Sequence, residues 1–339
     1  MVQHRTTRDT PLDKETVLKA GTLVALKLFK VSDDEQKSTS KIEDRRAVYQ
    51  SILKELEVLS DPRLRAHENI CQLLFVCWID ESNVPALALE LAAFGSLEDV
   101  LIAEGYGLSH RQKMSITVDI ALGLAAIHAC SFVHGDLKPG NIVLFRHEAR
   151  QIVAKVTDFG GSEVMASRET GDPPSGPALA TPAWCAPEVA YLEKSIDWQK
   201  ADSYAYGLVV ASVWCRPEQF LGSRPSSCIL DFMLELDMDS DEKQNTFLLL
   251  KSQTDTSRNS VVSICCRWMR CRDRNIHDLL CRIVRAVLCR DSAERVSVAS
   301  LLGTDIQSLS DYTTGQCRCV RPCPMLEFTL LRSFYIQEV

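Results

Sequence analysis

The pattern of apolar and polar residues predicts a first part of the chain that is rich in strands. Residues 22–30 form a short apolar run, which favours a strand with Ala25 and Lys27 on one face. Apolar residues then recur at helical spacing across residues 41–59. Two further runs favour strands, at residues 72–79 and 85–92.

From residue 94 onward the pattern is mainly helical. Ser109 can cap a long helix that ends near Cys130 and is apolar on one side. The apolar positions of this helix are Ile116, Ile120, Leu124 and Ile127. Residues 205–214 suit a buried helix, residues 275–288 are helical in pattern, and residues 152–156 favour a strand.

Irregular segments interrupt the helical part. Residues 166–183 are rich in Gly, Pro, Ser and Thr and predict an exposed loop. A second stretch, about residues 216–260, contains an acidic run and predicts a protruding insert, either a docking element or a long loop. The last 35 or so residues fit no regular pattern.

Composition and charge restrict the class of protein. The chain has 339 residues, of which 46% are hydrophobic and 24% charged, so it can bury a large core in one bilobal domain or two coupled lobes. The net charge of -7 gives no reason to expect nucleic acid as a partner. Because no signal peptide and no apolar run of membrane-spanning length are evident, we expect an intracellular, cytoplasmic protein.

The cysteines allow two interpretations. There are fourteen, mostly single within apolar segments such as those of Cys71, Cys77, Cys130 and Cys289, which favours buried reduced thiols. The alternative is a zinc site, although the spacings do not form a C-x-x-C pair. Its ligands would come from Cys265, Cys266, Cys271, Cys317, Cys319 and Cys323.

The run from His134 to Asn141 carries the most specific chemistry. It contains Asp136, Lys138 and Asn141, and Asp158-Phe159-Gly160 follows 17 residues after Asn141. An Asp can accept a proton from a hydroxyl group and a Lys can neutralise phosphate charge, while an Asn and a second Asp can ligate a divalent metal ion. The run therefore indicates phosphoryl transfer.

Together with motifs elsewhere, this run resembles the eukaryotic-type protein kinases over about residues 22–302. The resemblance implies an α+β fold with two lobes: a small β-rich N-lobe at residues 1–93 and a larger α-helical C-lobe at residues 94–302. Residues 303–339 would form a C-terminal tail. In the family's mechanism Asp136 is the catalytic base, Lys138 contacts the γ-phosphate, and Asn141 and Asp158 hold Mg2+.

The resemblance also implies an ATP site between the lobes. Val24-Ala25-Leu26-Lys27 resembles the V-A-I-K strand, whose Lys binds the α- and β-phosphates. A carboxylate must fix this Lys, and helical geometry favours Glu55 over Glu57 because Glu55 shares the inward face with the apolar stripe. Residues 87–92 resemble the segment that leads to the hinge, which would place Leu89 at the gatekeeper position and Glu90 and Ala92 at the adenine edge. Ala25 would also line the nucleotide site.

Residues 181–188 resemble the end of a kinase activation segment. Thr181 would then bond towards Asp136 and Lys138, and Glu188 would pair with Arg295. Asp202 matches the family's Asp that braces the catalytic loop through its backbone. Lys138 itself favours Ser and Thr acceptors.

Two departures from the family pattern concern regulation by phosphorylation and the binding of ATP. Gly135 stands where most regulated kinases carry an Arg that pairs with a phosphorylated activation loop, so we do not expect switching by that route. No Gly-rich loop is evident before Lys27, which indicates an N-lobe that is truncated, closes over ATP by other means, or binds ATP weakly.

The function that the resemblance implies is ATP- and Mg2+-dependent transfer of phosphate to Ser and Thr hydroxyls of protein substrates. Two alternatives stay open at this point. One is a catalytically impaired pseudokinase or scaffold. The other is a small-molecule phosphotransferase, a class that shares H-G-D-x-x-x-x-N but generally lacks counterparts of Lys138, the Asp-Phe-Gly triplet and the Ala-Pro-Glu segment.

Overall fold

A computed structural model gives the fold of most of the chain. It describes residues 22–29, 38–79, 84–102, 108–165, 181–191, 193, 196–215, 251, 255, 260–269, 271 and 273–314. The turn at residues 81–83, most of the loop at 166–183, nearly all of the insert at 216–260, and residues 1–21 lie outside these ranges. The expectation of a missing Gly-rich hairpin therefore falls outside the described residues.

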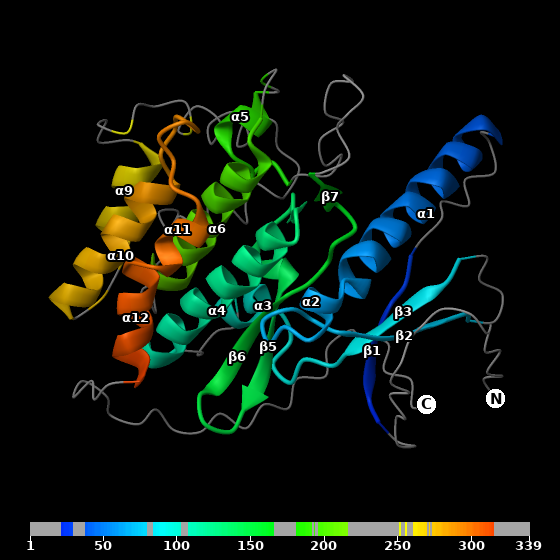
Figure 1. The fold of residues 1–339 in the computed structure, drawn as a ribbon, viewed down its shortest axis with the longest axis horizontal. Coiled ribbons are helices and arrows are strands. Elements are labelled where there is room, and N and C mark those ends of the chain that lie inside the picture. The colour runs from blue at the N-terminus through cyan, green and yellow to red at the C-terminus, as the bar shows by residue number, and fades with distance from the viewer. Residues whose placement is uncertain are drawn as a thin grey trace.

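The small lobe consists of an antiparallel sheet and one long helix (Figure 1). Its strands pair in the order β1-β3-β2, with Ala25 opposite Leu89 and Lys27 opposite Leu87. Helix α1 lies beside the sheet, and Ile52 buries its side chain in a small core with Leu87. The elements are β1 (Val24–Lys27), α1 (Ser38–Ser60), α2 (Pro62–Arg65), β2 (Leu73–Cys77) and β3 (Ala86–Glu90).

The large lobe is mainly helical, and together the two lobes form the α+β fold that the sequence predicts. Its elements are α3 (Leu97–Ile102), α4 (His110–Ala129), β4 (Phe132–Val133), a 3-10 turn (Pro139–Asn141), β5 (Ile142–His147), β6 (Gln151–Val156), β7 (Glu163–Val164), α5 (Pro187–Ala190), α6 (Trp198–Cys215), α9 (Val261–Trp268), α10 (Arg274–Val287), α11 (Val298–Leu302) and α12 (Asp305–Thr314). In Figure 1 the hairpin of β5 and β6 lies between the helices of this lobe and the small lobe.

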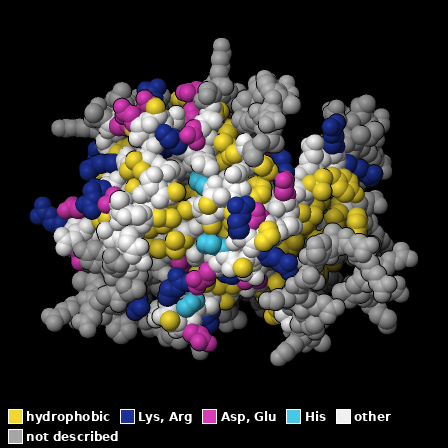
Figure 2. Space-filling model, in the orientation of Figure 1, with side chains coloured by type: hydrophobic (Ala, Val, Ile, Leu, Met, Phe, Trp, Pro, Cys, Tyr) yellow, Lys and Arg dark blue, Asp and Glu magenta, His cyan; other side chains and the backbone are white. Residues whose placement is uncertain are grey.

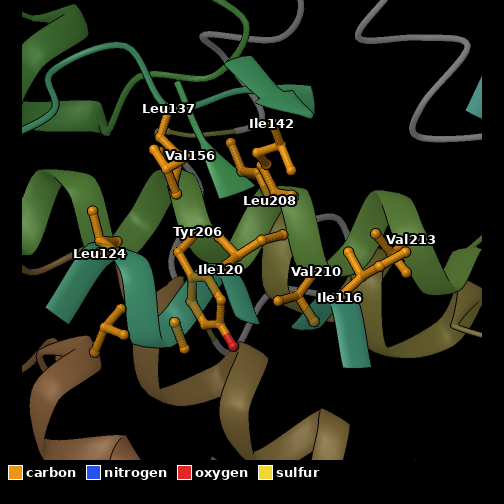
Figure 3. Close-up of a cluster of buried hydrophobic side chains, with 14 of the residues drawn as sticks. Ile116, Ile120, Leu124, Leu137, Ile142, Val156, Tyr206, Leu208, Val210 and Val213 are labelled. Atoms are coloured by element: carbon orange, nitrogen blue, oxygen red, sulfur yellow. The ribbon is translucent and has the colours of Figure 1, made fainter. Parts of the chain in front are cut away.

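Helices α4 and α6 form the centre of the large lobe. The predicted cap is present: Ser109 Oγ accepts a hydrogen bond from Gln112 N at 3.2 Å, and Gln112 Oε1 accepts one from Ser109 N at 2.8 Å. Figure 3 shows the apolar side of α4 packed against side chains of α6 and of the strands after the catalytic run. Tyr206 of α6 places its hydroxyl in this core, where it donates to the carbonyl of Thr117 at 3.1 Å.

The lobes are joined by backbone bonds as well as by the chain. Cys71 N donates to Val156 O and Val156 N donates to Asn69 O, both at 2.9 Å. Gly123 of α4 permits this approach, because a Cβ atom at residue 123 would lie 2.7 Å from Asn69 O. The segment between α2 and β2 is thereby fixed to the large lobe.

One expectation about the end of the chain is wrong. Residues 305–314 form helix α12, although the sequence pattern predicts no regular structure there. Ile306 and Leu309 are buried, and α12 packs against α4 and α10. A short helix with few apolar positions depends on this packing, so its sequence periodicity is weak.

The described cysteines are all free thiols. Cys71 and Cys130 are buried as expected, whereas Cys77 and Cys289 are partly exposed. Within the described ranges no group of three or more His, Cys, Asp or Glu side chains is arranged to hold a metal ion. Cys317, Cys319 and Cys323 lie outside those ranges.

The surface in Figure 2 mixes charges of both signs, with Lys and Arg near Asp and Glu. Hydrophobic side chains gather where α1 lies in Figure 1, and Tyr49 and Leu53 are large exposed residues of that helix. Among the described helices none is long and apolar enough to span a membrane.

Candidate functional site

The loop from His134 to Asn141 is braced from below by Asp202 of α6. Asp202 accepts hydrogen bonds from the backbone N–H of His134 at 2.8 Å and of Gly135 at 2.9 Å, and it contacts His128 Nε2 at 2.9 Å. Burial alone would raise the pKa of Asp202, but the bond with His128 and the backbone donors outweigh burial, so the pKa is lowered. The predicted bracing role of Asp202 is confirmed.

The backbone conformation of this loop explains why residue 135 is a glycine. Its φ angle is +80°, in the left-handed region that glycine adopts without the steric cost of a Cβ atom. Glycine therefore suits the turn that leads into Asp136. It also means that residue 135 lacks the guanidinium group with which phosphorylation-switched kinases bind the phosphate.

Asp136 is held by contacts on both carboxylate oxygens. Its Oδ1 accepts from Thr181 N at 2.9 Å and from Thr181 Oγ1 at 2.7 Å, and Lys138 Nζ lies 3.1 Å from Oδ2. Lys138 Nζ also donates to Thr181 Oγ1 at 2.7 Å. Asn141 Nδ2 donates to the carbonyl of Asp136 at 2.8 Å. The structure thus brings together all three side chains of the run and adds Thr181, as predicted.

Lys27 bridges the two lobes. Its Nζ lies 2.6 Å from Glu55 Oε2 and 2.7 Å from Asp158 Oδ1. Glu55 is fully buried whereas Glu57 is exposed, so the choice between these two residues by helical geometry is confirmed.

The electrostatics of this triad keep Lys27 charged. Burial would lower the pKa of Lys27, but the carboxylates of Glu55 and Asp158 raise it by more. Burial would likewise raise the pKa of Asp158, but Lys27, His134 and the backbone N–H of Gly160 together lower it by more. Burial does raise the pKa of Glu55, and Lys27 only partly opposes this.

Asp158 reaches the site because of the turn that follows β6. Its φ angle is +66°, a left-handed conformation that Asp tolerates better than most residues. Phe159 is buried, and its ring lies 5.4 Å from the ring of His134. The side chain of Asp158 is 45% exposed, so solvent still reaches it.

The end of the activation-segment motif is fixed by a buried ion pair. Arg295 Nη1 lies 2.5 Å from Glu188 Oε1, and Arg295 Nη2 lies 3.0 Å from Glu188 Oε2. The Arg295 guanidinium also stacks over Tyr204 at 4.9 Å. The predicted pairing is confirmed, and loss of one partner from such a buried pair costs about 3–5 kcal/mol.

Comparison with known proteins agrees with this geometry. The family model of the protein kinase domain matches residues 14–306. The chain belongs to the protein kinase family. As a member, it has a fold associated with ATP and divalent metal ions and with protein substrates.

Three relatives illustrate the range of this similarity. The chain is 28% identical to a probable serine/threonine-protein kinase, drkC, of Dictyostelium discoideum over 66% of this chain and 27% of that protein. It is 32% identical to the dual specificity protein kinase shkA of Dictyostelium discoideum over 45% of this chain and 28% of that protein. It is 29% identical to retinal guanylyl cyclase 2 of Bos taurus over 52% of this chain and 15% of that protein. The chain thus spans less than a third of the length of each relative.

Glu90, at the end of β3, makes side-chain contacts that the sequence did not reveal. Glu90 Oε1 accepts from Lys155 Nζ at 2.6 Å and from Gln72 N at 2.9 Å. The side chain of Glu90 is therefore engaged by Lys155 and Gln72, and its backbone N–H donates to Gln72 O at 3.1 Å. Leu89 is buried in β3, and Ala92 follows the strand.

Two further contacts of this kinase domain were also missed. Lys54 of α1 pairs with Glu163 at 2.7 Å, and Lys251 donates to backbone carbonyls of residues 182 and 185. Their partners are 109 and 66–69 residues away in the chain. Neither sequence motif nor local periodicity relates positions so far apart.

Proposed function

We propose that this chain is a protein kinase that uses ATP and Mg2+ to phosphorylate Ser and Thr hydroxyls of protein substrates. The observation that carries the proposal is the arrangement around Asp136, in which Thr181 and Lys138 hold one carboxylate between them. A kinase needs such an oriented carboxylate, because catalysis of phosphoryl transfer is mostly positioning and charge stabilisation.

Asp136 is the proposed catalytic base. It would orient the acceptor hydroxyl and take its proton, while Lys138, 3.1 Å away, would neutralise charge on the transferred phosphate. Thr181 keeps Asp136 and Lys138 at this separation, since it bonds to both.

Lys27 and Glu55 form the proposed anchor for the α- and β-phosphates. Fixed by Glu55 at 2.6 Å, the ammonium group of Lys27 needs no reordering when phosphate oxygens approach. Ala25 in β1 and the backbone of Glu90 and Ala92 complete the proposed adenine side of the nucleotide site.

Asn141 and Asp158 are the proposed metal ligands. Both offer oxygen donors, which Mg2+ prefers, and a Mg2+ site usually takes only one or two carboxylates together with phosphate oxygens and water. The amide nitrogen of Asn141 is used by the carbonyl of Asp136, which leaves its amide oxygen for the metal. ATP supplies the phosphoryl group, and the metal ion offsets the charge on the phosphates.

The acceptor class rests on Lys138, which Ser and Thr kinases share. Some relatives are named dual specificity kinases, so tyrosine is the competing acceptor. A small-molecule acceptor is disfavoured by Thr181 and by the Glu188–Arg295 pair, which belong to the segment that protein kinases use to bind protein substrates.

A scaffold without phosphotransfer is the second candidate. It is favoured by the similarity to a protein named as a guanylyl cyclase. A segment similar to this kinase domain is thus part of a protein that is named for a different activity. The scaffold hypothesis needs the fold but not the side chains around Asp136.

Identification of the phosphorylated amino acid tests the proposed acceptor. The purified chain is incubated with labelled ATP, Mg2+ and a basic protein, and the product is hydrolysed and separated. We expect label in phosphoserine and phosphothreonine. Label in phosphotyrosine alone, or in small molecules only, would contradict the proposal.

A further inference from the structure

A buried lysine from the insert region contacts the activation-segment motif. Lys251 is only 2% exposed, and its Nζ donates to Pro182 O at 2.8 Å and to Cys185 O at 2.6 Å. The Sγ atom of Cys185 lies 3.9 Å from the same nitrogen. Lys251, which lies within the stretch predicted as an insert, is thus packed against residues 182–185.

Burial of this ammonium group is costly unless its donors are used. A charged amine loses its hydration in the protein, so carbonyl oxygens at 2.6 and 2.8 Å must replace water. Burial lowers the pKa of Lys251 to about 8, although Cys185 and Glu188 oppose the change. The lysine remains largely protonated at neutral pH and can hold both carbonyls.

The two carbonyls lie in a segment that is fixed at each end. At its start Thr181 bonds to Asp136, and at its end Glu188 pairs with Arg295. The backbone between these anchors turns sharply, because Trp184 N and Cys185 N both donate to Thr181 O. Lys251 bonds to this turn, next to Thr181.

The turn borders the proposed site of phosphate transfer. Residues of the turn and of the catalytic loop line a small pocket above α6, which includes Asp136, Thr181, Trp184 and Cys185. A shift of the turn would move Thr181, and with it the contact that orients Asp136.

We propose that Lys251 is a positioning residue that holds the turn at residues 181–185 in place, so that a protein substrate is presented correctly to Asp136. Lys251 does not touch the reacting atoms. This role rests on the proposed protein kinase function, but the ordering of the turn does not depend on activity.

Amide hydrogen exchange tests the ordering of the turn directly. In Lys251→Met the ammonium group is lost while most of the side-chain volume remains. We expect exchange in peptides covering residues 181–191 to accelerate by about tenfold, the scale given by loss of a charge-assisted hydrogen bond, with residues 198–215 unchanged. Unchanged exchange in residues 181–191 would overturn the proposal.

Steady-state kinetics test the consequence for substrate. We expect Lys251→Met to raise KM for the protein substrate by about tenfold and to leave KM for ATP nearly unchanged. Lys251→Arg keeps a donor for each carbonyl, so its KM for the protein substrate should stay close to that of the unmodified chain. An equal change in both KM values, or no restoration by Arg, would contradict a positioning role.

Lys200→Met is the matched control. Lys200 also donates to a backbone carbonyl, that of Ala293 at 3.0 Å, but this carbonyl lies outside the turn at residues 181–185. This variant should alter neither the exchange of residues 181–191 nor KM for the protein substrate, and an effect equal to that of Lys251→Met would overturn the assignment.

Two outcomes need separate treatment. If Lys251→Met does not fold, Lys251→Gln is used, whose shorter amide should give an intermediate acceleration of exchange. If the unmodified chain transfers no phosphate, the proposed function fails, while the exchange experiment still decides whether Lys251 orders the turn.

Discussion

Asp119 shows how a single buried carboxylate affects the stability of the large lobe. Its side chain is fully buried in α4, with Oδ1 2.8 Å from Arg150 Nη1 and Oδ2 accepting from Ala154 N at 2.9 Å. Burial raises the pKa of Asp119 to about 6, although Arg150 and the backbone bond oppose this. The folded protein therefore binds this proton more tightly than the unfolded chain does.

The pH dependence of stability follows from that difference. Well below pH 4 Asp119 is protonated in both states; as the pH rises from 4 towards 7, the unfolded chain ionises first and is stabilised relative to the folded chain. The free energy of unfolding should fall by about 2 kcal/mol relative to Asp119→Asn across this range. Urea denaturation of both proteins from pH 4 to 7 measures this difference.

An exposed carboxylate provides the control for this prediction. Asp278 lies on the exposed side of α10, so Asp278→Asn removes one carboxylate without disturbing the core and controls for the loss of a charge. A difference between Asp119→Asn and the unmodified chain that stays constant from pH 4 to 7 would show that burial does not shift the titration of Asp119.

Residue by residue, predictions from the sequence succeeded where local geometry decides them. Glu55 could be chosen over Glu57 because both lie on one helix whose apolar face is known. The Glu90–Lys155 and Lys54–Glu163 pairs could not be found, since each joins charges from distant segments. The φ angle of Gly135 also depends on the bracing of the loop by Asp202.

Helix α1 is the element whose position the site depends on most. It supplies Glu55 to Lys27, and its Lys54 pairs with Glu163 in β7 just beyond the Asp-Phe-Gly triplet. In a chain with Gly135 in place of the phosphate-binding Arg, this second pair links α1 to the activation segment without phosphorylation.

Charge reversal tests that link. Glu163→Lys should lower kcat/KM by about two- to fivefold, because a partly exposed ion pair contributes about 0.2–1 kcal/mol. Combining it with Lys54→Glu restores an attractive pair and should recover most of the activity. Activity assays on the two single variants and the double variant measure the coupling between the residues.

Asp305→Lys is the control for this experiment. Arg282 and Asp305 form a partly exposed pair at 3.2 Å between α10 and α12. Its reversal should leave kcat/KM unchanged. If the loss of kcat/KM in the double variant at residues 54 and 163 equals the product of the losses in the two single variants, the residues are not coupled and the pair does not position α1.

Long elements were predicted better than short ones. Helix α4 carries its own start signal in Ser109 and Gln112, and its apolar side matches the buried face. The short helix α12 was missed because Ile306 and Leu309 alone give too weak a pattern, and packing on α4 and α10 stabilises it instead.

At the scale of the whole molecule, the site exists only because the two lobes are held together. Lys27 and Glu55 come from the small lobe and Asp158 from the large lobe, and the bonds of Val156 with residues 69 and 71 fix the lobes to each other. The sequence motifs predicted which residues meet. The junction, which requires Gly123 beneath Asn69, carries no sequence signal of comparable strength.

The central claim is that this assembled site transfers phosphate through Asp136. Its most direct test compares phosphate incorporation into a basic protein by the unmodified chain and by Asp136→Asn, with Asp278→Asn as a control for removal of a carboxylate. Thermal unfolding of each protein confirms that the variants are folded. We expect Asp136→Asn to lose about 100-fold or more of the activity, as removal of a general base does, while Asp278→Asn retains it. Equal incorporation by Asp136→Asn, or none by the unmodified folded chain, would contradict the claim.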